Sequence, residues 1–400
     1  MPVVTLPESL NKAALAQLIE ILAPHPTRLV GGVVRDALLG HGATDIDLAT
    51  TCPPEEAQDR LQRAGIQVIP TGVEHGTITA IIDTQAYEIT TLREDVSTDG
   101  RHATVSYTND FETDASRRDF TFNALYADLD GTLYDYFNGV ADLEAGHVRF
   151  IGDPAVRIAE DALRILRFFR FYARFGNFPP DDATRSALHA QSGLLARLSA
   201  ERITAEWLKI MAEPDPIAAL ELCTALKIHR ALGLKHLHTV ALAQHVKLFP
   251  ARRDPLERLA VLVWPQDVQV LTANNRFCWS TKQAAALRLL LKPAHTDLAE
   301  NLPPLQAAYT FGPAQYAALL AILAAHQSTP APNKSQAVAE AAALQPPAFP
   351  ITGHDALEAG VPQGAALGKA LRHVEAWWLQ KNFPDRTACL AELQAYLKSR

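Results

Sequence analysis

Two aspartates separated by one residue, Asp45 and Asp47, lie in a short alternating run that predicts a β-strand over 45–49. Side chains two positions apart on a strand point to the same face, so the two carboxylates should lie side by side. Neighbouring negative charges repel each other, and a divalent cation relieves this repulsion. Mg²⁺ prefers a few carboxylates together with substrate phosphates. The pair therefore predicts a Mg²⁺ site for phosphoryl or nucleotidyl transfer.

A glycine pair precedes these aspartates. Gly31 and Gly32 follow a predicted strand at 28–30 and lead into a predicted helix at 34–39. Glycine lets the backbone approach a phosphate closely, and a helix N-terminus offers unpaired N–H groups and a positive dipole. Arg35 is placed to reach the same phosphate. Either motif alone is common in turns or on surfaces, but the two together, joined by 33–44, indicate a nucleotide and metal site.

A second charged group lies on a helix predicted over 155–175. On one continuous helix Asp161 and Arg164 share a face. A carboxylate accepts from an exocyclic amine, and a guanidinium donates to a ring nitrogen or carbonyl. Cytosine and adenine both present an amine beside an acceptor, whereas uracil and guanine present an N–H there. The pair could therefore select C and A, because a wrong base leaves polar groups unpaired. The simpler interpretation is a salt bridge on a solvated helix.

Further stretches have a recognisable order and spacing. They are GVEHGTIT at 72–79, EITTLR at 88–93, DGRHA at 99–103, RRDFTFNAL at 117–125 and EDALRILRFFR at 160–170. With the motifs above, they resemble the class II tRNA CCA-adding enzymes and their bacterial poly(A) polymerase relatives, in the DNA polymerase β superfamily. The detailed resemblance covers roughly 28–210, and a weaker match lies at 349–355.

The resemblance implies roles for single residues. It implies catalysis and Mg²⁺ binding by Asp45 and Asp47, with Glu88 as a third catalytic carboxylate on a nearby strand; the simpler interpretation of Glu88 is a solvent-facing strand residue. Asp119 would orient neighbouring arginines. The segment 93–115 matches a flexible loop associated with switching from C to A addition, or is simply a long hairpin connection. Nucleotide binding is implied for Gly32, Arg35, Arg118, Asp161, Arg164, Arg167 and Arg170.

Apolar periodicity and turn residues indicate which elements position these side chains. The predicted strands are 28–30, 45–49, 67–69, 77–82, 87–91, 124–128 and 148–151. The predicted helices are 9–23, 34–39 and 55–64, then 155–175, 184–196, 200–212, 216–226, 255–263, 281–291, 304–325 and 364–380. A stretch rich in Pro, Ala and Gln at 327–350 predicts a mobile connection.

These elements predict an α+β fold, with an N-terminal nucleotidyltransferase head of mixed β-sheet and flanking helices followed by an all-α remainder. We expect an N-terminal helix in 1–27, a palm-like catalytic head in 28–152 and a helical neck with the nucleotide-selecting helix in 153–212. An RNA-binding helical body in 213–330 and an RNA-binding helical tail in 331–400 should follow.

The net charge and the cysteine spacing exclude some classes of protein and of site. The 400 residues carry a net charge of −7, which argues against a uniformly basic nucleic-acid coat but allows a local basic cleft. The four cysteines show no CxxC spacing, so we expect neither a disulfide framework nor a zinc site of that type, and a cytoplasmic location. Neither a membrane association nor a protein partner is expected.

We therefore expect a Mg²⁺-dependent enzyme that adds CCA to the 3′ end of tRNA from CTP and ATP, releasing pyrophosphate and using no template. The tRNA acceptor arm would be held mainly by its shape and backbone. The alternatives are a poly(A) polymerase, an A-adding-only tRNA nucleotidyltransferase and a non-catalytic RNA-binding module. Product length, use of CTP and the effect of Asp45→Ala distinguish them.

Overall fold

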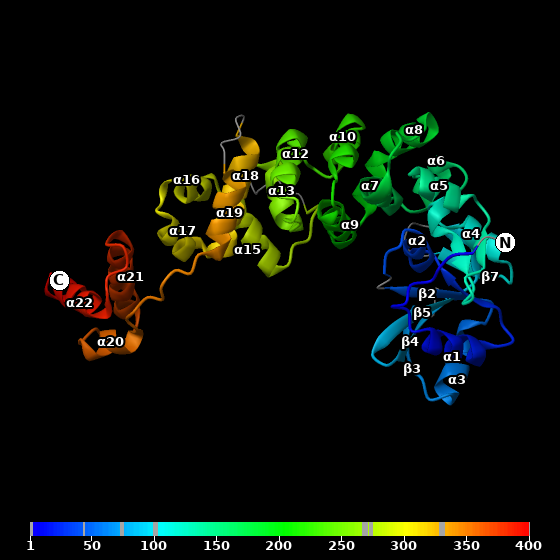
Figure 1. The fold of residues 1–400 in the computed structure, drawn as a ribbon, viewed down its shortest axis with the longest axis horizontal. Coiled ribbons are helices and arrows are strands. Elements are labelled where there is room, and N and C mark those ends of the chain that lie inside the picture. The colour runs from blue at the N-terminus through cyan, green and yellow to red at the C-terminus, as the bar shows by residue number, and fades with distance from the viewer. Residues whose placement is uncertain are drawn as a thin grey trace. The chain divides into compact units, whose positions relative to one another are not determined.

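The computed structural model describes residues 3–42, 45–72, 76–98, 103–265, 271, 275–327 and 333–399. The chain divides into two compact units (Figure 1). The first comprises Met1–Thr239 with Gln269–Trp279, and the second comprises Val240–Val268 with Ser280–Arg400. The predicted stretches 72–79 and 99–103 fall partly outside the described residues, at 73–75 and 99–102.

The first unit is built on a seven-stranded sheet in the order β3-β4-β5-β2-β1-β8-β9. The strands are β1 (Thr27–Val30), β2 (Ile46–Thr50), β3 (Gln67–Gly72), β4 (Thr77–Ile82), β5 (Gln85–Thr91), β8 (Leu125–Ala127) and β9 (Leu133–Asp135). Strands β2 and β5 pair in parallel, while the other neighbours pair antiparallel. The predicted mixed sheet and α+β class are therefore confirmed.

One face of this sheet carries the main hydrophobic core. Helices α1 (Lys12–Leu22), α2 (Gly32–Leu38) and α3 (Pro54–Arg63) pack against it. Ile46 and Leu48 of β2 point into this core, as do Tyr87 and Ile89 of β5. Because strand side chains alternate between faces, the residues between them, including Asp47, lie on the opposite face.

Two predictions in the head were incomplete. The predicted strand at 148–151 is wrong: Phe150 makes only an isolated bridge to Phe120, and its ring lies in a cluster of phenylalanines. The segment 93–115 forms a separate two-stranded sheet and then enters a short helix. These elements are β6 (Arg93–Thr98), β7 (Ala103–Tyr107) and α4 (Phe111–Ser116).

The rest of the first unit is helical, as predicted, but two predicted helices, 155–175 and 184–196, are each divided into two elements. The predicted helix 155–175 consists of α6 (Pro154–Glu160) and α7 (Leu163–Phe175). Asp161, between them, has an extended backbone with φ −148° and ψ 107°. The other elements are α5 (Gly139–Ala145), α8 (Asp182–Ala190), η3 (Ser192–Arg197), α9 (Ala200–Ala212), α10 (Ile217–Ala225) and α11 (Ile228–Ala231).

The second unit is helical throughout its described residues. It contains α12 (Thr239–Leu248), α13 (Pro255–Val263), α15 (Thr281–Leu290), α16 (Pro293–Asn301), α17 (Pro304–Phe311), α18 (Pro313–His326), α19 (Lys334–Ala343), α20 (Gly353–Glu358), α21 (Ala365–Gln380) and α22 (Arg386–Lys398). Helices α20, α21 and α22 share a core centred on Trp378. The predicted connection at 327–350 was partly wrong, because α19 occupies much of it and buries Val338.

The predicted helix 304–325 is also two helices. Helices α17 and α18 meet at Gly312, whose φ of +84° few side chains tolerate, and the pair is bent by 112°. Among the described residues, no single helix has the length and apolar composition needed to cross a membrane; this bent pair passes that test only when taken together.

Candidate active site

The structure places Asp47 and Glu88 next to each other on the face of the sheet opposite the main core. They are directly paired in the parallel register of β2 and β5, and both alternate with buried core residues. Asp45 lies one residue before β2 and is exposed. The structure thus brings Asp47 and Glu88 together as register partners, with Asp45 two residues before Asp47, although the three carboxylates do not all lie within 4.8 Å of one another.

The electrostatics of Asp47 fit a cation site. Burial, with the added negative charges of Glu88 and Asp45, raises its pKa to about 6. Arg118 and Arg35 act in the opposite direction but do not outweigh these effects. None of the ion pairs between described residues involves any of the three carboxylates. This all-oxygen donor set, with its uncompensated charge, suits a hard divalent cation.

The glycine turn lies beside these carboxylates. Gly31 has φ +70°, and a Cβ there would sit 3.5 Å from the Arg118 guanidinium. Helix α2 begins at Gly32, two residues earlier than predicted. Arg35 on this helix is buried and donates to Asn123 at 2.6 Å and to Asp36 at 2.9 Å. Its guanidinium is therefore held by neutral and acidic partners at the turn.

Arg118 is fixed by a buried acid. Its Nε and Nη2 atoms donate to Asp114 at 3.3 and 3.1 Å, and Nε also reaches the Tyr126 hydroxyl at 3.2 Å. Although burial alone would raise the pKa of Asp114, the charges of Arg118 and Arg117 hold it well below its ordinary value. Asp114 thus stays ionised and fixes two arginines, a role that sequence reasoning missed.

Asp119 orients an arginine of α7, as predicted. It accepts from Arg167 Nε at 2.5 Å and from Asn123 at 3.0 Å. Since Asn123 also accepts from Arg35, one chain of hydrogen bonds links the glycine turn with α7. Burial would raise the pKa of Asp119, but Arg167 and Asn123 outweigh it and lower the pKa.

The predicted Asp161 and Arg164 pair lies at the break between α6 and α7. The two residues are not i and i+3 on one helix, so that part of the prediction was wrong; Asp161 Oδ1 instead accepts from the backbone of Leu163 at 3.0 Å. Arg164 donates to Glu160 at 2.5 Å and to the carbonyl of Arg117 at 3.0 Å. The carboxylate and the guanidinium are therefore set by different partners.

Arg202 supplies the other partner of Asp161. Its Nη2 atom donates to Asp161 Oδ2 at 2.8 Å from α9. Helix α9 also contributes Glu206, a buried acid that accepts from Arg170 at 3.0 Å. The sequence signal for both was available: they are four apart on a correctly predicted helix, so they share a face.

Arg167 and Arg170, for which the resemblance implies nucleotide binding, lie along α7 together with Arg174. Arg167 pairs with Asp119 and Arg170 with Glu206, while Arg174 reaches Asp36 at 3.3 Å. Arg35, Arg167 and Arg170 all approach the ring of Phe171, at 5.1, 5.6 and 4.5 Å from its centre. Each of these guanidinium groups on α7 is therefore paired with an acid and points in a defined direction, and those of Arg167 and Arg170 also pack against Phe171.

Two protein families and several known proteins match this chain. Residues 27–149 match the family described as "Poly A polymerase head domain", and 177–237 match "Probable RNA and SrmB- binding site of polymerase A". The chain is 35% identical to "CCA tRNA nucleotidyltransferase 1, mitochondrial" of Mus musculus, over 98% of this chain and 91% of that protein. It is 32% identical to the "CCA-adding enzyme" of Lacticaseibacillus paracasei, over 91% of each.

Solved structures extend the likeness to the fold. The Bacillus stearothermophilus CCA-adding enzyme in complex with CTP superimposes with a TM-score of 0.76 at 25% identity, covering 98% of this chain and 99% of that one. The Thermotoga maritima CCA-adding enzyme complexed with tRNA superimposes with a TM-score of 0.68 at 21% identity, covering 99% and 100%. The second match bears on the fold alone.

Proposed function

Because the chain belongs to the family of CCA tRNA nucleotidyltransferases and CCA-adding enzymes, we propose that it adds C, C and A in turn to tRNA 3′ ends from CTP and ATP. The observation that carries this proposal is the pairing of Asp47 with Glu88 on the sheet face opposite the main core, beside the glycine turn. Nucleotidyl transfer of this family generally requires a divalent metal, and Mg²⁺ is the ion we propose.

The proposed chemistry begins with the carboxylates. Asp45 and Asp47 would hold Mg²⁺, which lowers the pKa of the attacking 3′-hydroxyl and neutralises the leaving pyrophosphate. Glu88, next to Asp47 in the register, keeps the local field negative and so favours the cation. Gly32, Arg35 and Arg118 would bind the triphosphate, with Arg118 directed by Asp114.

The proposed base selection uses the break between α6 and α7. The carboxylate of Asp161 and the guanidinium of Arg164 would form hydrogen bonds with the pairing edge of C or A, and would leave polar groups unpaired against U or G. Arg202 and Glu160 hold these two groups in place through separate ion pairs. Arg167 and Arg170 would add positive charge toward the triphosphate or the RNA backbone.

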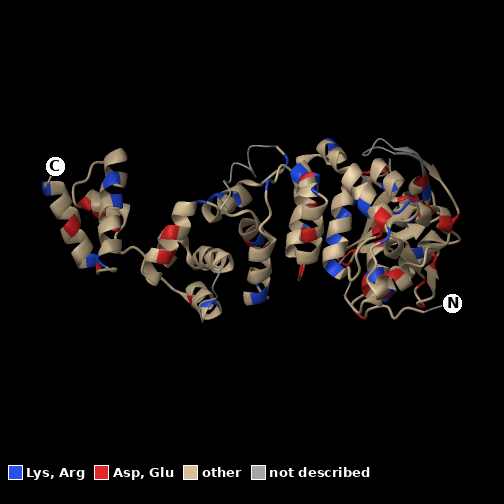
Figure 2. Cartoon of the chain, turned by 90° about the horizontal axis from the view of Figure 1, so that it is seen from above, with Lys and Arg blue, Asp and Glu red and all other residues tan. Residues whose placement is uncertain are grey.

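We assign the chain to five parts. They are an N-terminal part at 1–27 that contains helix α1, a catalytic head at 28–152, a neck at 153–212, a body at 213–330 and a tail at 331–400. The body and tail would hold the tRNA acceptor arm through scattered basic side chains. Figure 2 shows Lys and Arg interspersed with Asp and Glu along the helices, so the proposed contacts to the RNA backbone would come from separate basic side chains and not from one basic patch.

The test uses tRNA ending before its CCA. The full chain should incorporate CTP and ATP in the presence of Mg²⁺, and a mixture should give a product longer by three nucleotides. A long adenylate tail would favour the poly(A) polymerase alternative, and failure with CTP alone would favour A-only addition. If neither nucleotide is incorporated, the proposal is wrong.

We also propose a cytoplasmic location. All four cysteines are free thiols, and three of them are buried, which suits a reducing compartment. The mouse, zebrafish and human relatives carry mitochondrial names, whereas the names of the bacterial relatives give no compartment. Cell fractionation with an antibody to the full chain measures the location, and enrichment in an organelle would contradict the proposal.

A further inference from the structure

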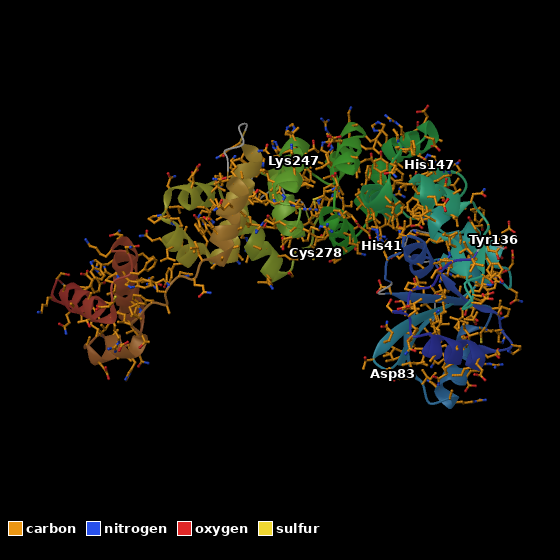
Figure 3. The ribbon with its side chains drawn as sticks, viewed as in Figure 1. His41, Asp83, Tyr136, His147, Lys247 and Cys278 are labelled. Atoms are coloured by element: carbon orange, nitrogen blue, oxygen red, sulfur yellow. The ribbon has the colours of Figure 1, made fainter. Side chains whose placement is uncertain are left out.

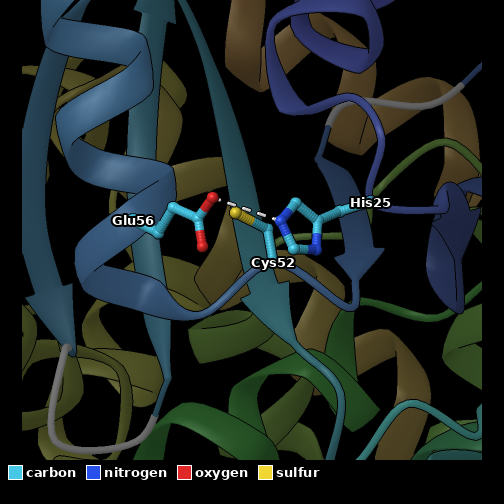
Figure 4. A group of neighbouring side chains, drawn as sticks. All are labelled: His25, Cys52 and Glu56. Carbon is cyan, nitrogen blue, oxygen red and sulfur yellow. Dashed lines mark hydrogen bonds and ion pairs between the residues drawn. The ribbon is translucent and has the colours of Figure 1, made fainter.

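Three chemically different side chains converge at the end of β2 farthest from Asp47. They are His25, ahead of β1, Cys52, just after β2, and Glu56, in the first turn of α3 (Figure 4). One nitrogen, sulfur or oxygen atom from each lies within 4.8 Å of the other two. Across the part of the chain that the structure describes, no other three His, Cys, Asp or Glu side chains gather in this way.

We propose that these three side chains bind one zinc ion. Zinc takes sulfur, imidazole nitrogen and carboxylate oxygen at about 2.0–2.3 Å, in a tetrahedron that a water molecule can complete. Ligand atoms of such a tetrahedron lie roughly 3.4–3.8 Å apart, so the cluster must close by about 1 Å. His25 and Glu56 are only partly buried and can rotate by this amount. Mg²⁺ would not favour this set, since it prefers oxygen ligands.

Cys52 is the fixed member of the set. Its N–H donates to the Thr50 hydroxyl at 3.1 Å, and its carbonyl accepts from the Thr91 hydroxyl at 2.6 Å. Thr50 and Thr91 are paired at the ends of β2 and β5, so the sheet holds the thiol in position. Burial raises the pKa of this thiol to about 11, and zinc binding would displace its proton.

Glu56 is already ionised and has an oxygen to offer. Hydrogen bonds from Arg60 and His25 hold the pKa of Glu56 below its ordinary value. The contacts recorded from Arg60 (Nε at 2.9 Å, Nη2 at 2.8 Å) and from His25 (3.3 Å) all reach Oε1. Oε2 is therefore available to the metal, while Arg60, which also donates to the carbonyl of Ala23 at 2.6 Å, orients the carboxylate from outside.

The location indicates a structural role for the ion. Cys52 lies five residues from Asp47 along the β2 direction, or roughly 17 Å at the rise of a strand. Zinc at this cluster would connect the turn before β1, the end of β2 and the start of α3. It should therefore raise the thermal stability of the head without taking part in nucleotidyl transfer.

Cobalt titration of the metal-free full chain provides the test. Co²⁺ substitutes for Zn²⁺, and a thiolate ligand gives a near-ultraviolet charge-transfer band that oxygen ligands at Asp45 and Asp47 do not produce. We expect one such band per chain, bleached by added Zn²⁺. Cys52→Ser should abolish it, and His25→Ala should weaken Co²⁺ binding at least about tenfold. Cys278→Ser, which removes an exposed thiol, is the matched control and should leave the band unchanged.

Absence of the band in the wild type, or its survival in Cys52→Ser, overturns the zinc site. If Cys52→Ser does not fold, His25→Ala decides, with circular dichroism as the check that it is folded; unchanged cobalt affinity in this variant contradicts the proposal. A second readout is the thermal midpoint, which Zn²⁺ should raise in the wild type and not in His25→Ala. Nucleotide incorporation with Mg²⁺ should be the same in both, so this test is independent of the proposed function.

Discussion

The two charged regions of the first unit are built in opposite ways. On the sheet, Asp47 and Glu88 lie side by side without a described cation as ion-pair partner, and burial raises the pKa of Asp47 to about 6. Between α6 and α7, Asp161 and Arg164 each have a counter-charge, Arg202 and Glu160. We propose that the negative charge of the first region would hold a cation, and that the oriented side chains of the second would bind a base. The following predictions test this contrast.

The largest effect should come from Asp47→Asn. The change keeps the shape of the side chain but removes the charge that holds the cation, so CTP incorporation should fall by at least about 10²–10³-fold. Incorporation into tRNA lacking CCA, with Mg²⁺, measures this. Asp83→Asn, on the turn between β4 and β5 (Figure 3), is the control and should keep wild-type activity. Near-normal rates of CTP incorporation by Asp47→Asn would show that this face of the sheet takes no part in the reaction.

Asp161→Ala should alter the selection of the nucleotide more than the rate of incorporation. Without the carboxylate, the preference for CTP over UTP should fall about 10–100-fold, because the exocyclic amine of C loses its specific acceptor. Separate kcat/KM values for all four nucleotides measure this. Asp182→Ala, an exposed acid on α8, is the control. An equal loss for all four nucleotides would mean that Asp161 does not select the base.

Arg202→Ala should also lower the preference for CTP over UTP, but by a smaller factor than Asp161→Ala. The ion pair to Asp161 is partly exposed, with 34% and 27% of the two side chains accessible, so its loss should reduce the CTP preference only about 2–5-fold. The double variant Asp161→Ala/Arg202→Ala should then match Asp161→Ala alone. Arg197→Ala is the control. Additive effects in the double variant would show that Arg202 acts independently of Asp161.

The last prediction concerns stability instead of activity. The folded-state pKa of Asp47, about 6, lies above the ordinary value of 3.8, so folding disfavours its charged form. Without metal, the wild type should lose stability relative to Asp47→Asn as the pH rises from about 4 to about 6, and keep that deficit above it. Allowing for partial exposure, we expect about 1–2 kcal/mol.

Denaturant unfolding in EDTA at several pH values measures this difference. Saturating Mg²⁺ should reduce or reverse it, because the cation compensates the charge only in the wild type. If Asp47→Asn is less stable than the wild type at pH 8 in EDTA, repulsion between the carboxylates does not destabilise the folded state.

The accuracy of the sequence predictions also differs between the two regions. Alternation was enough to predict that Asp47 points to one face of its strand, since the period of a strand is fixed by its backbone, whereas Glu88 was implied only by the resemblance. The helix 155–175 was predicted from an apolar period that continues through Asp161, although the chain is extended there. The break has no glycine or proline signal; the side chain of Asp161 accepts from Leu163 and Arg202 instead.

The sequence by itself determined the carboxylate pair, the glycine turn, a head of strands and helices followed by a helical remainder, and the resemblance that these features carry. These features depend on local spacing and backbone periodicity. Only the tertiary structure decided that β2 and β5 are neighbours, which puts Asp47 beside Glu88, and that α9 supplies Arg202 to Asp161. Such contacts join residues about 41 positions apart, and the packing of the core, not local propensity, brings them together.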